Sequence, residues 1–433
     1  MNKHTNILTT GFAVATTFLL TFFLSTPFAL AQSVPTPGAP QTQRIVLKGG
    51  TLHLGNGQPA AKSDIALKNG VISEIAPNIP ADSSEILNVA GKHIYPGILA
   101  PSTQMGLDEI ESVRATEDKK EVGAINPNVR AIIGYNADSR VTPTIRSNGI
   151  LLAEVAPTGD LFAGSASVVR LDAWNWEDAY ISADREIRNP ISGVHLYWPR
   201  MRFREAWWAP PIEEQKKKTK AHLQKVETAM EEARRYWQQK TGGQAGAVDV
   251  RWEALIPVLE KRIPLFIHAS DEKQIQSAVG FMLRHDIRIV VVGGADAWLM
   301  TDLLRQYDIP VVLRQPHSLP RLEDDDVDRS YKTARILHEA GLTVALSMRD
   351  FWNQRNLPFQ AGTAAAYGLD KEAALQLITL NPAKILGIGD RYGSLEKGKS
   401  ATLLVSSGDL LDMPRIFAGF SVISCRAASL SRP

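Results

Sequence analysis

Residues 263–268 read Ile-Pro-Leu-Phe-Ile-His, a short apolar run that ends in a polar residue. Runs of the same kind recur at residues 287–292, 309–313 and 342–346, and helix-type stretches separate them. Strands that alternate with helices in this way predict a parallel sheet with helices outside it. The alternation fills residues 96–388, a length that suits a (β/α)8 barrel. An open doubly wound sheet is the alternative, although no Gly-x-Gly-x-x-Gly motif follows a strand.

A different pattern precedes the barrel. Short β-type runs flank Asn69-Gly70, a dipeptide typical of two-residue hairpin turns because both turn positions need a positive φ. Strand-like sequence returns at residues 393–405. We therefore predict an α/β fold, a TIM-like (β/α)8 barrel plus a small composite β-sandwich built from residues 44–95 and 389–433. The last twenty residues, 414–433, are an atypical tail for such a unit.

The first 31 residues differ in composition from the rest of the chain. They contain one basic residue, Lys3, an apolar run over residues 11–24, and the ending Ala29-Leu30-Ala31. This arrangement predicts a signal peptide that is removed before Gln32. The apolar run is short for a membrane span, so no stable membrane anchor is expected after cleavage. The expected location is periplasmic or extracellular, with residues 32–43 as a linker.

The charge balance restricts the partners of the chain. It has 433 residues, with 48 Lys and Arg against 46 Asp and Glu, and a net charge of +2. A balance so close to zero argues against nucleic acid as a partner. The single cysteine, Cys425, excludes an internal disulfide and a cysteine-rich metal site. A small-molecule substrate or ligand is the expected partner, and self-association into a homo-oligomer is an open alternative.

Three segments carry a resemblance to a known family. They are residues 89–97, VAGKHIYPG, then residues 380–388, LNPAKILGI, and finally residues 393–399, GSLEKGK. In this order they resemble the amidohydrolase superfamily, nearest to its secreted imidazolonepropionase-related members. The segments are similar to the entry into the first barrel strand, the last barrel helix and the return to the β unit. The resemblance covers about residues 44–405 and implies a metal-dependent hydrolase with a barrel and a composite β-sandwich.

The resemblance also implies where the metal ligands should lie. In the family, divalent metals at the barrel mouth lower the pKa of a bound water molecule. A His-x-His motif on the first strand supplies two ligands, and the matching positions here are Ser102 and Gln104. Hydroxyl and amide oxygens are poor replacements for imidazole on zinc. The strand-six histidine position falls near Gly293-Gly294, so most of the usual ligands are absent.

By the same resemblance, His268 is the strand-five metal ligand. Asp350 is the candidate catalytic base, although it comes one or two residues after the expected position. This pair implies at most one weakly held divalent metal, zinc or manganese, as the cofactor. Candidate substrate contacts are His195, Trp174 and Trp176, and the two tryptophans lie in a tryptophan-rich insertion at about residues 155–245. Packing of the insertion's own core is the alternative explanation of its tryptophans.

Other catalytic sets are alternatives to the metal. A Ser/His/Asp set would use Ser102 or Ser347 with His268 and Asp350, without a Gly-x-Ser-x-Gly motif to support it. Paired carboxylates for glycoside hydrolysis could come from Glu154, Asp172 or Glu177.

We expect, from the resemblance, an exported hydrolase that acts on C–N bonds of a small amide or cyclic amide, other than peptide bonds. The missing ligands mean that this activity could be altered or lost. The alternative is a catalytically silent ligand-binding protein, a pseudoenzyme, on the same barrel.

Overall fold

The computed structural model describes residues 37–431, with gaps at residues 39, 81, 83, 111, 182–190, 204, 206, 245, 322, 324, 349, 413–419 and 425–426. The described residues belong to one compact unit. The predicted signal peptide and the first part of the predicted linker lie outside them, as does Cys425.

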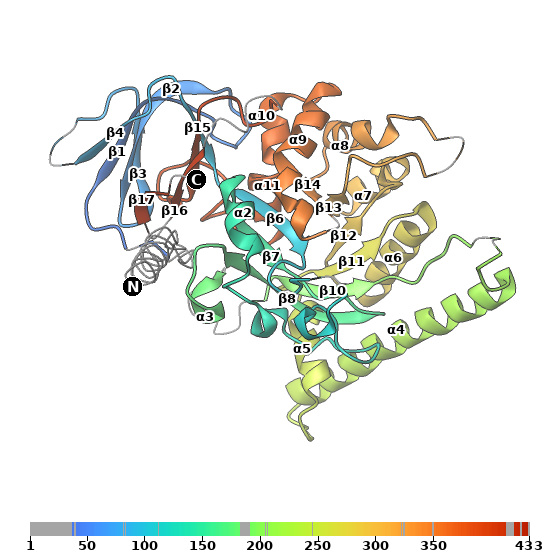
Figure 1. The fold of residues 1–433 in the computed structure, drawn as a ribbon. Helices are drawn as coiled ribbons and strands as arrows, with labels where there is room; N and C mark the ends of the chain where they lie inside the picture. The colour runs from blue at the N-terminus through green and yellow to red at the C-terminus, as the bar shows by residue number, and fades with distance from the viewer. Residues whose placement is uncertain are drawn as a thin grey trace, which may run out of the picture. The chain divides into compact units, whose positions relative to one another are not determined.

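Eight strands form the barrel sheet, in the order β14-β13-β12-β11-β10-β8-β7-β6, and a short strand, β9, pairs with β8 (Figure 1). Their bounds are β6 Ile98–Thr103, β7 Ile150–Val155, β8 Phe162–Arg170, β9 Tyr180–Ile181, β10 Gly193–Tyr197, β11 Leu265–Ala269, β12 Ile289–Gly293, β13 Val311–Arg314 and β14 Val344–Ser347.

One barrel strand runs against the others. β8 pairs antiparallel with β7 and with β10, whereas β6 with β7 and β10 through β14 pair in parallel. Residues 156–161 join β7 to β8, and so short a connection cannot hold the crossover that a parallel pair needs. The TIM-like fold class is confirmed, and the strict alternation of strand and helix is interrupted at this strand.

The barrel is closed through a short segment between its two end strands. The amide of Leu99 in β6 donates to the carbonyl of Ile378, and the amide of Leu346 in β14 donates to the carbonyl of Leu377, both at 2.9 Å. The Ser347 hydroxyl also donates to the Pro101 carbonyl at 2.6 Å. These bonds satisfy backbone groups that an open sheet edge would leave unpaired.

Most helices follow the parallel strands and cover the outside of the barrel. The α-helices are α2 Val141–Ser147, α3 Trp176–Ala179, α4 Ile212–Thr241, α5 Val250–Leu259, α6 Glu272–His285, α7 Thr301–Gln306, α8 Arg329–Glu339, α9 Leu357–Ala366, α10 Lys371–Gln376 and α11 Leu380–Ile385; the 3₁₀ helices are η1 Arg114–Thr116, η2 Ala131–Gly134, η3 Ala297–Leu299 and η4 Trp352–Asn356.

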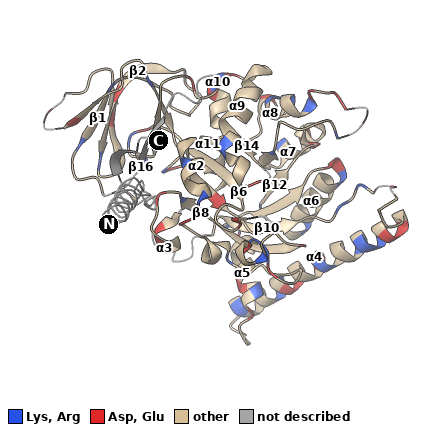
Figure 2. Ribbon diagram, in the orientation of Figure 1, with Lys and Arg blue, Asp and Glu red and all other residues tan. Residues whose placement is uncertain are grey.

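Helix α4 is long and spans Ile212–Thr241. Its lysine-rich run over residues 216–220 is largely exposed, and Figure 2 shows basic and acidic residues along the helix. This matches the solvated face that such a charge pattern favours. Among the described residues, no helix combines the length and the apolar character that a membrane span requires.

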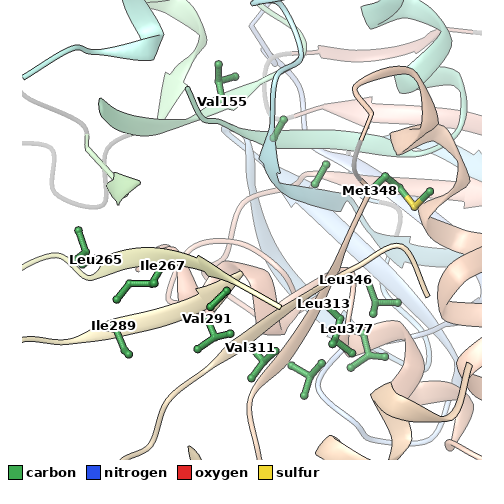
Figure 3. Close-up of a cluster of buried hydrophobic side chains, with 14 of the residues drawn as sticks. Val155, Leu265, Ile267, Ile289, Val291, Val311, Leu313, Leu346, Met348 and Leu377 are labelled. Carbon is green, nitrogen blue, oxygen red and sulfur yellow. The ribbon is translucent and has the colours of Figure 1, made fainter. Parts of the chain in front are cut away.

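Alternate residues of the barrel strands enter two different cores. Leu265, Ile267, Ile289, Val291, Val311, Leu313 and Leu346 belong to the larger core that packs against the helices (Figure 3). Their neighbours Leu99, Leu152, Phe266, Val290, Val292, Val312 and Ala345 form a second cluster with residues of α11, Ala383 and Ile385. Because strand side chains alternate between faces, this second cluster fills the barrel interior, and we call it the inner core.

The second sheet contains strands from both chain ends, in the order β17-β16-β15-β5-β1-β2-β3, with β4 paired to β1. The strands are β1 Ile45–Leu52, β2 Ala61–Lys68, β3 Val71–Ala76, β4 Glu85–Asn88, β5 His93–Pro96, β15 Leu403–Ser406, β16 Phe420–Ser424 and β17 Ala427–Ser431. Asn69 and Gly70 join β2 to β3 with φ values of 54° and 73°, as the hairpin prediction requires. Despite its atypical sequence, the tail supplies β16, which pairs with β15.

Candidate functional site

Polar side chains replace the inner core toward the carboxyl ends of the parallel strands. His195 and Phe266 are register partners on β10 and β11, and so are Tyr197 and His268. Since Phe266 belongs to the inner core, these register partners place His195, Tyr197 and His268 on the same inward face. Active sites of TIM-type barrels form at this end of the strands. We call these residues, with Glu154 and Arg314, the mouth cluster.

The centre of the mouth cluster is a pair of histidines. His195 Nδ1 lies 2.9 Å from His268 Nε2, so one ring donates to the other. Tyr197 stacks on His268 with 3.9 Å between ring centroids, and Phe266 stacks on His195 at 4.8 Å. Both imidazoles are therefore held in orientation by ring contacts as well as by their mutual hydrogen bond.

Glu154 on β7 lies next to this pair and is fully buried. Its carboxylate accepts the Ser102 amide at 3.0 Å and the Ser192 hydroxyl at 2.6 Å. His195 Nε2 lies 3.5 Å from the same carboxylate, long for a hydrogen bond. A proton on His195 Nε2 suits this neighbour, and it makes His195 Nδ1 the acceptor of a proton carried by His268 Nε2.

With that arrangement, His268 Nδ1 carries the free lone pair of the cluster. This nitrogen is buried and has no hydrogen-bond partner among the described residues. Burial lowers the pKa of His268 well below its usual value, and the Arg314 guanidinium and His195 lower it further. The imidazole is therefore neutral near pH 7.

Arg314 at the end of β13 supplies the positive charge of the mouth cluster. Its Nη2 donates to the Ser102 hydroxyl at 2.8 Å and to the Ser102 carbonyl at 3.3 Å. Burial raises the pKa of Tyr197, and the nearby Arg314 guanidinium opposes that rise. Ser102 has a φ of 52°, inside a register shift between β6 and β7 that turns its backbone toward the arginine.

The mouth cluster does not fit a divalent metal. Within the part of the chain that the structure describes, no three His, Cys, Asp or Glu side chains come together as metal ligands. His268 Nε2 is already bonded to His195, and a guanidinium lies close enough to lower the pKa of His268. A cation at this position disfavours a second cation. We therefore derive no chemical step through a metal ion.

The last residue of β12 also excludes an added ligand. Gly293 has a φ of 110°, and a Cβ built there would lie 2.5 Å from Ser270 Oγ and 3.0 Å from the Ala269 carbonyl. A histidine at this position would be strained whatever its side chain contacted.

The structure brings together only some of the predicted site residues. His268 and His195 come together in the mouth cluster. The carboxylate of Asp350 accepts the amide of Trp352 at 2.8 Å and the side-chain amide of Asn353 at 3.2 Å. These bonds turn Asp350 toward the start of η4, and among the described residues no hydrogen bond or ion pair joins its carboxylate to either histidine. Its role as a base stays a prediction.

The two tryptophans follow β8, and the direction of that strand decides where they lie. Because β8 is antiparallel, its carboxyl end lies beside the beginning of β7, as the Leu152 to Arg170 register shows. Trp174 and Trp176 therefore lie toward the opposite end of the barrel from the mouth cluster. Trp174 is 58% exposed, and Trp176 packs against the larger core.

Three members of the mouth cluster were not predicted as a group. Tyr197 shares a strand face with His195, and Arg314 ends an apolar run, so alternation along the strands is the signal that could have found them. The sequence singled out Glu154 only as a candidate carboxylate for glycoside hydrolysis. Another carboxylate of that set, Asp172, forms an ion pair with Arg146 at 3.1 Å.

An open cleft adjoins the mouth cluster at the ends of β12 and β13. It has an empty volume of about 510 Å³, and Arg314 forms part of its wall together with Trp298, Leu319, Arg321 and Arg329. A larger cleft of about 1360 Å³ lies at the other end of the barrel, where Pro264, Ile289 and Pro310 begin the strands. The smaller cleft is the one at the end where TIM-type barrels bind ligands.

Comparisons with known proteins agree with this architecture. Residues 260–424 match the sequence model of the Amidohydrolase family. An amidohydrolase structure from Thermotoga maritima superposes with a TM-score of 0.74 and 23% identity, over 88% of this chain and 98% of that chain.

Two curated relatives match over short stretches. An allantoinase of Desulfitobacterium hafniense is 44% identical over 54 residues, 12% of this chain and 12% of that protein. An imidazolonepropionase of Syntrophobacter fumaroxidans is 40% identical over 84 residues, 18% of this chain and 20% of that protein. The chain thus matches no more than about a fifth of the length of these two relatives.

The fold, with its barrel and its sheet from both chain ends, defines an amidohydrolase-type barrel protein. Over residues 260–424 the sequence is similar to the Amidohydrolase family, and the fold is that of the amidohydrolase structure from Thermotoga maritima.

Proposed function

We propose that this chain binds a small molecule at the carboxyl end of its barrel without hydrolysing it through a metal-bound hydroxide. The observation that carries the proposal is the mouth cluster itself. A hydrogen-bonded histidine pair and a guanidinium occupy the interior there, and hydrogen bonds to Ser102 hold the guanidinium in place. Ser102 and Gln104 at the usual His-x-His positions support the same conclusion from sequence.

Hydrolysis of a C–N bond in a small amide or cyclic amide is the second candidate. The match of residues 260–424 to the Amidohydrolase family favours it, and so do the short matches to an allantoinase and an imidazolonepropionase. In this case His268 Nδ1 is the group available to accept a proton, because its other nitrogen is bonded to His195. Export of the protein to the periplasm or beyond is part of both proposals and rests on the sequence of residues 1–31.

The metal content of the purified protein tests the proposal. We expect zinc and manganese well below one equivalent by elemental mass spectrometry, even after growth with added zinc, because the cluster lacks a ligand set. The His268→Ala variant should contain the same small amount. About one equivalent of metal in the wild type that is lost in His268→Ala would overturn the proposal and favour the hydrolase.

A further inference from the structure

The cleft beside the mouth cluster has an excess of positive charge. Of the charged side chains that line it, Arg314, Arg321 and Arg329 are basic, and Asp296 and Asp325 are acidic. Asp296 already accepts Arg202 and Arg321, each at 3.0 Å. Two arginines therefore share the single charge of Asp296, and Asp325 is the one other acid of the wall beside Arg314 and Arg329.

One of these arginines lies over an aromatic ring. The Arg329 guanidinium lies 4.0 Å above the Trp298 ring, and its ion pair with Asp326 is long, at 3.6 Å. Leu319, which also lines the cleft, is 85% exposed. A wall that combines an aromatic ring, an exposed leucine and guanidinium groups suits a ligand with an apolar body and an anionic group.

Arg314 connects this cleft to the barrel interior. It lines the cleft, and its Nη2 is fixed by Ser102 on the strand at the opposite end of the sheet order. A guanidinium held in place by the protein loses less freedom when it binds a planar anion, and carboxylates match its two-pronged geometry.

We infer that the cleft between the ends of β12 and β13 is a binding site for a small organic carboxylate with an aromatic or flat apolar body. The inference rests on the proposed binding function and names the class of its ligand. Arg321 and Arg329 contact the carboxylate, Trp298 and Leu319 contact the apolar body, and Arg314 places the bound molecule next to His268.

Calorimetric titration with hippurate tests this site, because hippurate has a carboxylate, a flat ring and an amide bond. Hippuramide, which has the same shape without the charge, and inorganic phosphate are the comparison ligands. We expect hippurate to bind at least about tenfold more tightly than hippuramide, as one lost charge-assisted hydrogen bond implies. Phosphate should not displace it.

Arg321→Gln and Arg329→Gln should each weaken hippurate binding by about tenfold or more. Arg305→Gln is the matched control, since Arg305 is exposed on α7, pairs with Asp302 and does not line the cleft. Arg314 is left unchanged because its loss could disturb the barrel. Circular dichroism spectra should be the same for all variants.

Three results would overturn the inference: no hippurate binding by the wild type, equal binding by both arginine variants, or displacement by phosphate at equal concentration. Failure of the proposed function gives a different result. If hippurate is converted to benzoate and glycine while the arginine variants bind it weakly, the carboxylate site stands and the non-hydrolytic function is wrong.

Discussion

At the scale of single residues, the chemistry of the barrel mouth depends on which nitrogen of each of the two histidines carries its proton. Glu154 accepts hydrogen bonds from the Ser102 amide and the Ser192 hydroxyl, and these bonds hold its carboxylate next to His195. The carboxylate orients His195, and His195 orients His268. Burial and the Arg314 guanidinium both disfavour a positive charge on His268. His268 is consequently neutral, and its hydrogen bond to His195 determines which of its nitrogens carries the proton.

This arrangement predicts a particular pH dependence of stability. The folded-state pKa of His268 is depressed by burial, by Arg314 on β13 and by His195 on β10. In the unfolded chain His268 has an ordinary pKa of about 6.5, so below this pH it binds a proton that it does not bind in the folded chain. Stability from this group is therefore complete above about pH 6.5 and is lost as the pH falls, by at most about 1.4 kcal/mol per unit.

Urea unfolding of the wild type and of His268→Asn between about pH 7 and pH 5.5 measures this effect. The free energy of unfolding should fall less steeply with pH in the variant, by up to one proton. His222→Asn is the control. Burial and two neighbouring lysines also lower the pKa of His222, but less than the pKa of His268 is lowered, so this substitution should change the slope less. Parallel pH profiles for wild type and His268→Asn would contradict the neutral histidine.

At the scale of elements, sequence reasoning succeeded where the pattern was local. The runs at residues 263–268 and 287–292 and the turn at Asn69-Gly70 each contain their own signal. The direction of β8 could not be predicted, because it depends on the length of a connection whose ends are known only once the strands are placed. That direction also decided the position of Trp174 and Trp176. Arg314 was missed since a cation is not a ligand in the family pattern.

Helix α6 shows how an element can position the site. It begins three residues after β11, and Asp271 and Gln274 form a capping box at its first turn. The Gln274 side chain also donates to the carbonyls of Trp198 and Pro199, which follow Tyr197 of the mouth cluster. The cap therefore joins the end of β10 to the end of β11.

Asp271→Ala should lower the free energy of unfolding by about 1 to 2 kcal/mol, the usual cost of a lost cap. Asp271→Ser keeps an acceptor for the Gln274 amide and should recover most of that loss. Chemical denaturation of the three proteins gives the comparison. Equal stability of Asp271→Ala and wild type would show that the cap does not hold this helix.

At the scale of the whole molecule, the second sheet and the barrel are joined by buried polar contacts. His53 lies just after β1 and is hydrogen-bonded through both ring nitrogens. Its Nδ1 lies 2.7 Å from Glu372 Oε1 of α10, and its Nε2 lies 2.8 Å from His93 Nδ1. Tyr95 stacks on His53 at 4.1 Å between ring centroids, and its hydroxyl bonds to Asp409. Burial raises the pKa of Tyr95, and Asp409 raises it further, so this phenol stays protonated as a donor.

These contacts predict that the sheet and the barrel unfold together. Glu372→Ala removes the acceptor of a buried histidine, and we expect a loss of about 2 to 3 kcal/mol, as for other hydrogen bonds to charged groups. Glu339→Ala is the matched control: Glu339 is 59% exposed, and its pair with Arg335 at 3.8 Å should contribute less than about 0.5 kcal/mol.

Two probes separate the parts of the molecule, because all nine tryptophans lie after residue 96. Tryptophan fluorescence therefore follows the barrel, and hydrogen exchange of β1, β2 and β3 follows the second sheet. In the wild type both should change at the same urea concentration. In Glu372→Ala the sheet should exchange before the fluorescence changes, because its link to α10 is broken. If the sheet already opens first in the wild type, and Glu372→Ala costs no more than Glu339→Ala, the buried contacts do not couple the two parts.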